Sequence, residues 1–127
     1  MEIEKTIFDE RPTMLAFEGD MIRINFDVEG VDVKLDSSSS DSKSKVKEAF
    51  AAYVVRIPQP IGYDKVVNAI VTAAYPADKM QALINNHLLD GDDDDEHAAE
   101  FQEMQEWRKR AKTWAKEAMA EYVESIK

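Results

Sequence analysis

Cysteine is absent from the 127-residue chain. Its absence excludes disulfide bonds, thiolate nucleophiles, iron–sulfur clusters and zinc sites built from cysteine, and it is consistent with a reducing compartment. Glycine is scarce too, and none of the four glycines has the spacing of a phosphate-binding loop. The sequence therefore gives no support for thiol chemistry or for nucleotide binding.

Long apolar runs are also missing. The longest apolar stretches, such as Phe50–Val55, are far shorter than the roughly 20 residues that a membrane-spanning helix needs. The first residues, Met1–Pro12, are acidic where a signal peptide would be positively charged, and no apolar segment follows them. We therefore expect a soluble protein that is not secreted, stays in the cytoplasm of the cell that makes it and makes no membrane contact.

Positive charge is in short supply. The chain has 16 Lys and Arg against 26 Asp and Glu, so its net charge is −10. A protein with this charge is repelled by phosphate backbones, which argues against binding to nucleic acid. The same charge favours solubility and suits a partner with a basic surface.

Metal ligands other than carboxylates are few. Of the two histidines, His87 lies beside the apolar side of its predicted helix, which favours a structural role, and His97 falls in a first helical turn, where we expect it to be exposed. An EF-hand frame from Asp92 to Glu103 places His97 where the loop requires glycine, so the acidic run predicts no dedicated calcium site. No metal and no other cofactor is predicted.

Motifs for nucleophilic catalysis are absent as well. Neither GxSxG nor HExxH occurs in the sequence. The serines gather in the polar segment Ser37–Lys45, where no packed structure would hold a nucleophile in place. We therefore predict no catalytic residue and a protein that is not an enzyme.

The first half of the chain shows the alternation of a β-strand. Between Met21 and Val28, apolar even-numbered residues alternate with polar ones, which is typical of a strand with one wet face. From Val31 to Leu35 the apolar positions are odd-numbered, and Gly30 lies at the switch. A glycine at such a slip predicts a β-bulge or a tight turn.

Three further segments complete the predicted β region. Thr13–Phe17 is a predicted strand, and Glu18–Asp20 turns it back as a hairpin. The low-complexity segment Ser37–Lys45 predicts a flexible loop, with a regulatory phosphorylation site as the alternative. Glu48–Ile57 returns to apolar β-type residues, and the Pro-Gln-Pro sequence after it ends the strand.

Helical periodicity follows in the second half. Apolar residues at helical spacing predict helices over Tyr63–Ala74, Ala77–Leu89 and Glu96–Ser125. The inward side of the second helix is expected to include Leu88. Asp95 is the predicted N-cap of the last helix, because an aspartate run suits the positive end of a helix dipole.

These segments predict a single α+β domain over residues 1–127, with a β region at 1–60 that contains the loop 37–45 and a helical region at 61–127. We expect a small antiparallel sheet of about three or four strands followed by three helices, the last one long. At ~1.5 Å per residue the last helix is ~45 Å long, more than the width of a domain of this size. Its end must project or pack on another copy, so we predict a homo-oligomer through the face Trp107–Tyr122.

Two tryptophans are the most informative large residues. Trp107 and Trp114 are seven positions apart and therefore share one helical face. This spacing favours packing on the sheet or on the other helices. The alternative is contact with a protein partner, because aromatic residues are enriched at interface hot spots. The other candidate partner contact is the acidic run Asp92, Asp93, Asp94 and Asp95.

Several short motifs mark the helical half. They are Tyr63–Val67 (YDKVV), Ala74–Pro76 (AYP), Asp78–Ala82 (DKMQA) and Glu106–Arg108 (EWR) ahead of Ala111 and Lys112. In these motifs the second half of the chain resembles small uncharacterised proteins encoded in phage and prophage-like clusters of gut Bacteroides-type bacteria. The layout is similar to accessory proteins of phage tail modules, in which a short β region precedes such helices. The resemblance implies no catalytic residue.

Three functions are therefore open. The first is a non-enzymatic accessory protein of a phage-like element, which binds a co-encoded protein partner, as in virion tail assembly. The second is an acidic inhibitor that mimics the charge of DNA and blocks a nucleic-acid enzyme; the net charge and the acidic stretch Asp90–Glu106 motivate it. The third is a small hydrolase or metal-dependent enzyme, and the residues favour it least.

Overall fold

The computed structural model of the chain describes residues 1–34, 46–90 and 95–127. Over these residues the elements are β1 (Thr6–Phe8), β2 (Leu15–Glu18), β3 (Met21–Lys34), β4 (Val46–Pro58), α1 (Tyr63–Ala74), α2 (Ala77–Asp90) and α3 (Asp95–Ser125). The predicted α+β class is confirmed, with an antiparallel sheet first and three helices after it, the last one long. The predicted loop 37–45 lies outside the described residues.

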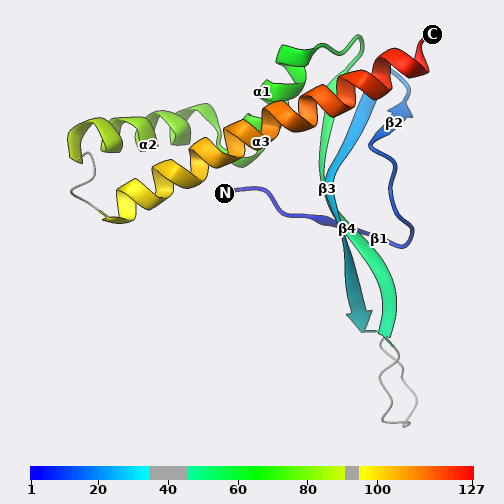
Figure 1. The fold of residues 1–127 in the computed structure, drawn as a ribbon, viewed down its shortest axis with the longest axis horizontal. Helices are drawn as coiled ribbons and strands as arrows, with labels where there is room; N and C mark the ends of the chain where they lie inside the picture. Colours follow the sequence, from blue (N-terminus) through cyan, green and yellow to red (C-terminus); the bar gives the residue numbers. More distant parts are fainter. Residues whose placement is uncertain (35–45, 91–94) are drawn as a thin grey trace.

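The sheet has the order β1-β4-β3-β2, and every pair of neighbouring strands is antiparallel. The long strands β3 and β4 form its centre. β2 pairs only with the start of β3, whereas β1 pairs with the middle of β4 around Ala51. One end of the β3–β4 ribbon therefore lies under the helices, and the other end projects away from them (Figure 1).

A β-bulge divides β3. Phe26 pairs with Tyr53, but Glu29 pairs with Ala51, so β3 carries one extra residue. The bulge contains Asp27, which adopts a positive φ of 54°. It explains the switch of apolar parity, yet the predicted position at Gly30 is wrong, because Gly30 pairs regularly in the ladder.

The bulge keeps the apolar side chains of β3 on one face of the sheet. The register places Val31 and Val33, beyond the bulge, on the same face as Ile24 before it. That face is the one that the helices cover at the other end of the ribbon. The part of the sheet beyond the bulge projects from the helices, and we call it the β arm: Glu29–Lys34 of β3, Val46–Ala51 of β4 and the strand β1 beside them. The β arm therefore continues the apolar face without a helix over it.

The predicted hairpin before β3 is confirmed. Gly19 has a φ of 64°, and Glu18 pairs with Met21 across the turn. A residue with a side chain rarely adopts this backbone conformation, which accounts for glycine at the turn. The strand begins at Leu15, because the Thr13 carbonyl accepts a hydrogen bond from the Asn25 side chain at 2.7 Å.

The core lies between the sheet and the helices. Val66, Ile70 and Ala74 of α1 are buried, and α3 lies across them with a stripe of small and large side chains. The buried members of this stripe are Met104, Trp107, Ala111, Trp114, Ala115 and Ala118. No helix in the described parts of the chain is long and apolar enough to span a bilayer.

Both tryptophans belong to this core. The Trp107 indole donates a hydrogen bond to the Ile70 carbonyl at 3.0 Å and packs edge-on against the Tyr53 ring. Trp114 lies 4.8 Å from the Phe26 ring, centroid to centroid. The side chains are only 2% and 8% exposed. The prediction that this face packs on the sheet or on the other helices is therefore confirmed. The stripe is covered and is not free to bind a second copy.

Candidate binding pocket

A pocket of about 390 Å³ opens between α3, the bulge of β3 and the segment that leads into β2. It lies at the free edge of the sheet, where β2 has ended its pairing with β3. The surface of its lining is mostly polar, although five of the ten lining residues are apolar: Arg11, Pro12, Met14, Asn25, Phe26, Asp27, Val28, Trp114, Glu117 and Glu121.

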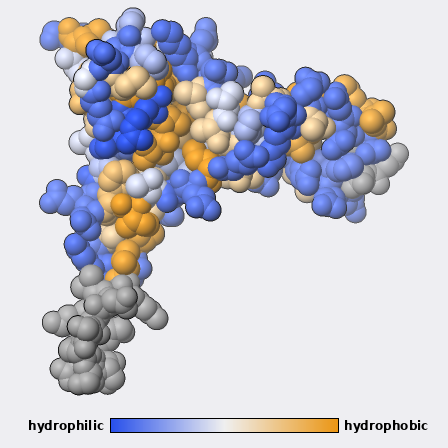
Figure 2. All heavy atoms as spheres, turned by 180° about the vertical axis from the view of Figure 1, so that it is seen from behind, coloured by the Kyte–Doolittle hydropathy of each residue, from blue (hydrophilic) through white to orange (hydrophobic). Residues whose placement is uncertain are grey.

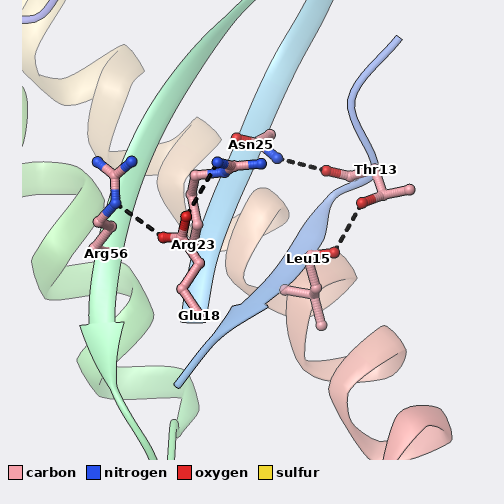
Figure 3. Close-up of polar contacts among 6 residues, drawn as sticks. All are labelled: Thr13, Leu15, Glu18, Arg23, Asn25 and Arg56. Atoms are coloured by element: carbon pink, nitrogen blue, oxygen red, sulfur yellow. Dashed lines mark hydrogen bonds and ion pairs between the residues drawn. The ribbon is translucent and has the colours of Figure 1, made fainter. Parts of the chain in front are cut away.

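Asn25 is the one polar side chain in the buried core of the described residues, with 1% of its surface exposed. Its amide nitrogen donates to the Thr13 carbonyl at 2.7 Å (Figure 3). Its backbone N–H donates to the Met14 carbonyl at 2.8 Å. These bonds fix the segment before β2 along the edge of β3. The Oδ1 atom is covered and accepts no hydrogen bond from any described residue. A buried acceptor left in this state costs about 1–3 kcal/mol.

Asp27, at the bulge, is held by two cations. Its Oδ2 atom lies 3.3 Å from the Lys5 Nζ and 3.1 Å from an Arg110 guanidinium nitrogen. Lys5 also pairs with Glu29 at 3.1 Å, and Arg110 lies over the Trp114 ring at 4.6 Å. The network ties the N-terminal segment and α3 to the bulge, and it neutralises the carboxylate at this side of the pocket.

The two glutamates at the other side are different. Glu117 and Glu121 lie one helical turn apart on α3, are exposed, and pair with no cation in the part of the chain that the structure describes. Arg11, which also lines the pocket, lies over the Phe50 ring at 6.0 Å instead. The pocket thus presents two carboxylates that pair with no described cation, whereas the covered Oδ1 atom of Asn25 is not exposed to it.

The sequence-predicted partner contacts fall in different places. Trp114 forms part of the pocket wall, whereas Trp107 lies deeper in the core. Asp95 is exposed and is the first residue of α3. It therefore lies inside the helix, whereas the sequence predicted it as the N-cap that precedes the helix. The rest of the acidic run, residues 92–94, lies outside the described residues.

Sequence reasoning missed Asn25 and the two glutamates. Asn25 stands among polar residues that alternate with apolar ones, so it was assigned to the wet face of its strand. Only the folding of residues 11–14 over the strand edge buries it. Glu117 and Glu121 follow the cationic segment Arg108–Lys116 in the sequence, and this pattern gave no sign that they share a pocket.

A smaller cavity of about 240 Å³ lies between the first residue, α2 and α3, and Tyr75 lines it. Burial raises the pKa of Tyr75 to about 12, and the nearby carboxylates Glu103 and Glu100 act in the same direction. Tyr75 therefore stays protonated at ordinary pH and donates its hydroxyl hydrogen to Glu103.

The two histidines lie on α2 and α3, the pair of helices that we call the helical hairpin. The His87 ring stacks on the Phe101 ring at 3.9 Å, as expected for a structural histidine. His97 is not fully exposed as predicted, because its Nδ1 lies 2.7 Å from the Asp90 carboxylate. Among the residues that the structure describes, no three His, Asp or Glu side chains are placed to hold a metal ion.

Large apolar side chains are exposed at the tip of the helical hairpin. Leu88 and Leu89, at the end of α2, are 76% and 83% exposed, so the prediction that Leu88 faces inward is wrong. His87 takes the inward position next to α3. Figure 2 shows apolar surface at this tip and along the β arm, where Ile7 is 54% exposed.

Comparisons with protein-family models, with curated proteins and with solved structures give no match to this chain.

Proposed function

We propose that the chain is a non-enzymatic accessory protein of a phage or prophage-like element, which binds a co-encoded protein in the cytoplasm of the bacterial host during assembly of the virion tail. The exposed pair Leu88 and Leu89 carries the proposal. Burying one leucine side chain yields about 1.5–3 kcal/mol, so two adjacent leucines at a projecting tip suit a protein contact. The resemblance of the helical half to phage tail accessory proteins supplies the setting.

The charge around the leucine pair favours a partner with basic residues. Asp90 follows the leucines, Asp95 and Glu96 open α3, and the chain as a whole has a net charge of −10. An apolar patch with an acidic rim has the usual anatomy of a protein interface, in which the rim steers association and the centre supplies affinity.

Co-expression with the products of neighbouring genes, one at a time, tests the proposal. We expect one product to form a complex that survives size-exclusion chromatography. Leu89→Lys should weaken this complex by roughly tenfold or more, because it places a charge in the apolar centre. Ala82→Lys is the matched control, since it adds the same charge at another exposed position of α2. The proposal fails if no neighbouring product binds, or if Leu89→Lys binds as tightly as the unmodified protein.

A second candidate is the acidic inhibitor that mimics DNA. The exposed glutamates Glu96, Glu100 and Glu103 follow one another at helical spacing along α3, which gives a row of negative charge. In a pull-down, recovery of a nuclease or polymerase instead of a virion component would favour this function. Neutralising the three glutamates together should then abolish inhibition.

A further inference from the structure

We infer that two copies of this chain associate through the apolar face of the β arm, with the two arms stacked antiparallel about a two-fold axis. This face lies on β1, β3 and β4, whereas the leucine pair lies at the end of α2, so the inference is independent of the proposed function. It rests on the exposure of the face, on its charge and on the order of its residues.

The face is apolar, and the helices leave it uncovered. Ile7 pairs with Ala51, and Val31 pairs with Ala49 two residues before it in β4. Paired residues, and residues two apart on a strand, lie on the same surface of a sheet, so Ile7, Val31 and Val33 form one apolar face. Ile7 is 54% exposed, both valines are partly exposed, and Figure 2 shows apolar surface along the arm. A two-stranded ribbon is only marginally stable alone in water, so a second layer over this face would stabilise the arm.

The charges on this face cancel, although the chain as a whole has a net charge of −10. The charged residues that β3 and β4 place on it are Glu29 and Lys47. Glu29 lies 3.1 Å from the Lys5 Nζ, and the Lys47 Nζ lies 3.3 Å from the Asp9 carboxylate. Two copies of an acidic protein repel each other through most of their surface, so they can associate only where the contact is neutral. A basic partner gains nothing at such a face, whereas a second copy avoids repulsion there.

The order of residues along the face is self-complementary. Glu29 lies next to the bulge, Val31 and Val33 follow it, and Lys47, the partner of Val33 in the ladder, lies at the far end. When two arms stack antiparallel about a two-fold axis, each Lys47 lies against the Glu29 of the other copy. The valines of both copies then meet in the centre. Such a contact uses the same surface on both copies, so it closes at a dimer.

The size of the arm sets the strength of the contact. The six residues Glu29–Lys34 of β3 span ~20 Å, and three strands are ~10–15 Å wide. A stable interface of standard size buries ~800 Å² on each partner, which is more than two stacked arms can bury. We therefore expect a weak dimer, which forms at high micromolar to millimolar protein concentration.

Sedimentation velocity of the whole protein, from micromolar to millimolar concentration, tests the inference. We expect a monomer–dimer equilibrium that depends on concentration. Ile7→Lys should raise the dissociation constant of the dimer by roughly tenfold or more, because the two-fold axis places the new charge twice in the apolar contact. Thr6→Lys is the matched control, since it adds the same charge at the neighbouring exposed position of β1, on the opposite surface of the sheet. It should leave the dissociation constant nearly unchanged.

An exchange of charges tests the antiparallel order. Lys47→Glu alone sets glutamate against Glu29 at both ends of the dimer, and Glu29→Lys alone sets lysine against Lys47, so each variant should associate less than the unmodified protein. A mixture of the two variants restores an opposite charge at both ends. We therefore expect the mixture to associate more tightly than either variant alone. Recovery in the mixture would also show that both variants are folded.

Four results would overturn the inference. They are a monomer throughout the concentration range, equal weakening by Thr6→Lys and Ile7→Lys, a mixture of charge variants that associates no more tightly than its components, and a dimer that Val123→Lys abolishes but Ile7→Lys leaves intact. The last result would place the contact between copies at the exposed end of α3 instead.

Discussion

Tyr75 shows how one buried residue makes stability depend on pH. Its pKa is raised from the ordinary 10.0 to about 12, first by burial and then by Glu103 and Glu100. Since the folded state holds the proton more tightly than the unfolded state, the neutral hydroxyl stabilises the fold below pH 10.0, and this contribution is lost as the pH rises through about 12.

Tyr75→Phe tests this account. The variant keeps the ring but loses the hydroxyl that donates to Glu103, so near neutral pH we expect it to be less stable by roughly 1 kcal/mol. Above the ordinary tyrosine pKa of 10.0 the deficit should shrink, because phenylalanine has no proton to lose. Urea unfolding at neutral and alkaline pH measures both effects. Tyr63→Phe, at an exposed position, is the control, and a constant deficit in Tyr75→Phe would contradict the assignment.

At the scale of the element, two glycines in the β region have opposite roles. Gly19 needs a positive φ to close the hairpin, whereas Gly30 has an ordinary strand conformation with nothing within 4 Å of an added Cβ. Gly19→Ala should therefore cost roughly 1 kcal/mol. Gly30→Ala should leave stability unchanged or raise it by up to about 1 kcal/mol, because alanine restricts the unfolded chain.

The free energy of unfolding in urea distinguishes these variants. The two substitutions add the same methyl group to exposed glycines of the same sheet, so each serves as the control for the other. A loss of stability at Gly30 as large as at Gly19 would mean that the bulge lies where the sequence pattern first placed it.

The elements differ in how far the sequence predicts them. α1 has the predicted limits, because its apolar spacing and the proline after it are local signals. β1 was not predicted, because Thr6–Phe8 is short and its strand is defined by pairing with the distant Ala51 and its neighbours. The bulge was misplaced because Asp27 is held in its backbone conformation by Lys5 and Arg110, which no local pattern brings together.

The same reasoning applies to the pocket. Its walls come from segments near both ends of the chain and from the part of β3 that β2 leaves unpaired, and only the fold makes them neighbours. Helical spacing correctly placed Trp114 on the inward face of α3. It gave no means to foresee that this indole would form a wall shared with Asn25.

At the scale of the whole molecule, the aromatic cluster joins the two halves of the chain. Trp107 contacts Tyr53 and Phe26 of the sheet and bonds to Ile70 of α1. Because the apolar residues of sheet and helices form one core, we expect residues 1–127 to unfold as a single cooperative unit.

Urea titrations followed by far-ultraviolet circular dichroism and by tryptophan fluorescence should give the same midpoint. Trp107→Phe removes the bond to the Ile70 carbonyl, so both midpoints should fall together, by roughly 1–3 kcal/mol of unfolding free energy. Arg108→Ala, one position along on the exposed side of α3, is the control and should stay within about 0.5 kcal/mol. Separate midpoints for the two probes would show that the sheet and the helices unfold independently.

The homo-oligomer stays a prediction at this scale. The stripe from Trp107 to Ala118, through which it was expected to form, is covered by the sheet and by α1. A second copy would need another apolar surface, and near the end of α3 the exposed side chains of Val123 and Ile126 offer one.

The bulge in β3 also decides which changes of length the chain can tolerate. If one residue were deleted at Asp27 or Val28, unbroken alternation would be restored and every later side chain of the strand would turn over. Val31 and Val33 would move to the opposite surface, and Asp32 would take their place. The alternation of apolar and polar residues beyond residue 28 therefore matches the two faces of the sheet only while the additional residue is present. The bulge residue and the two valines must be retained together.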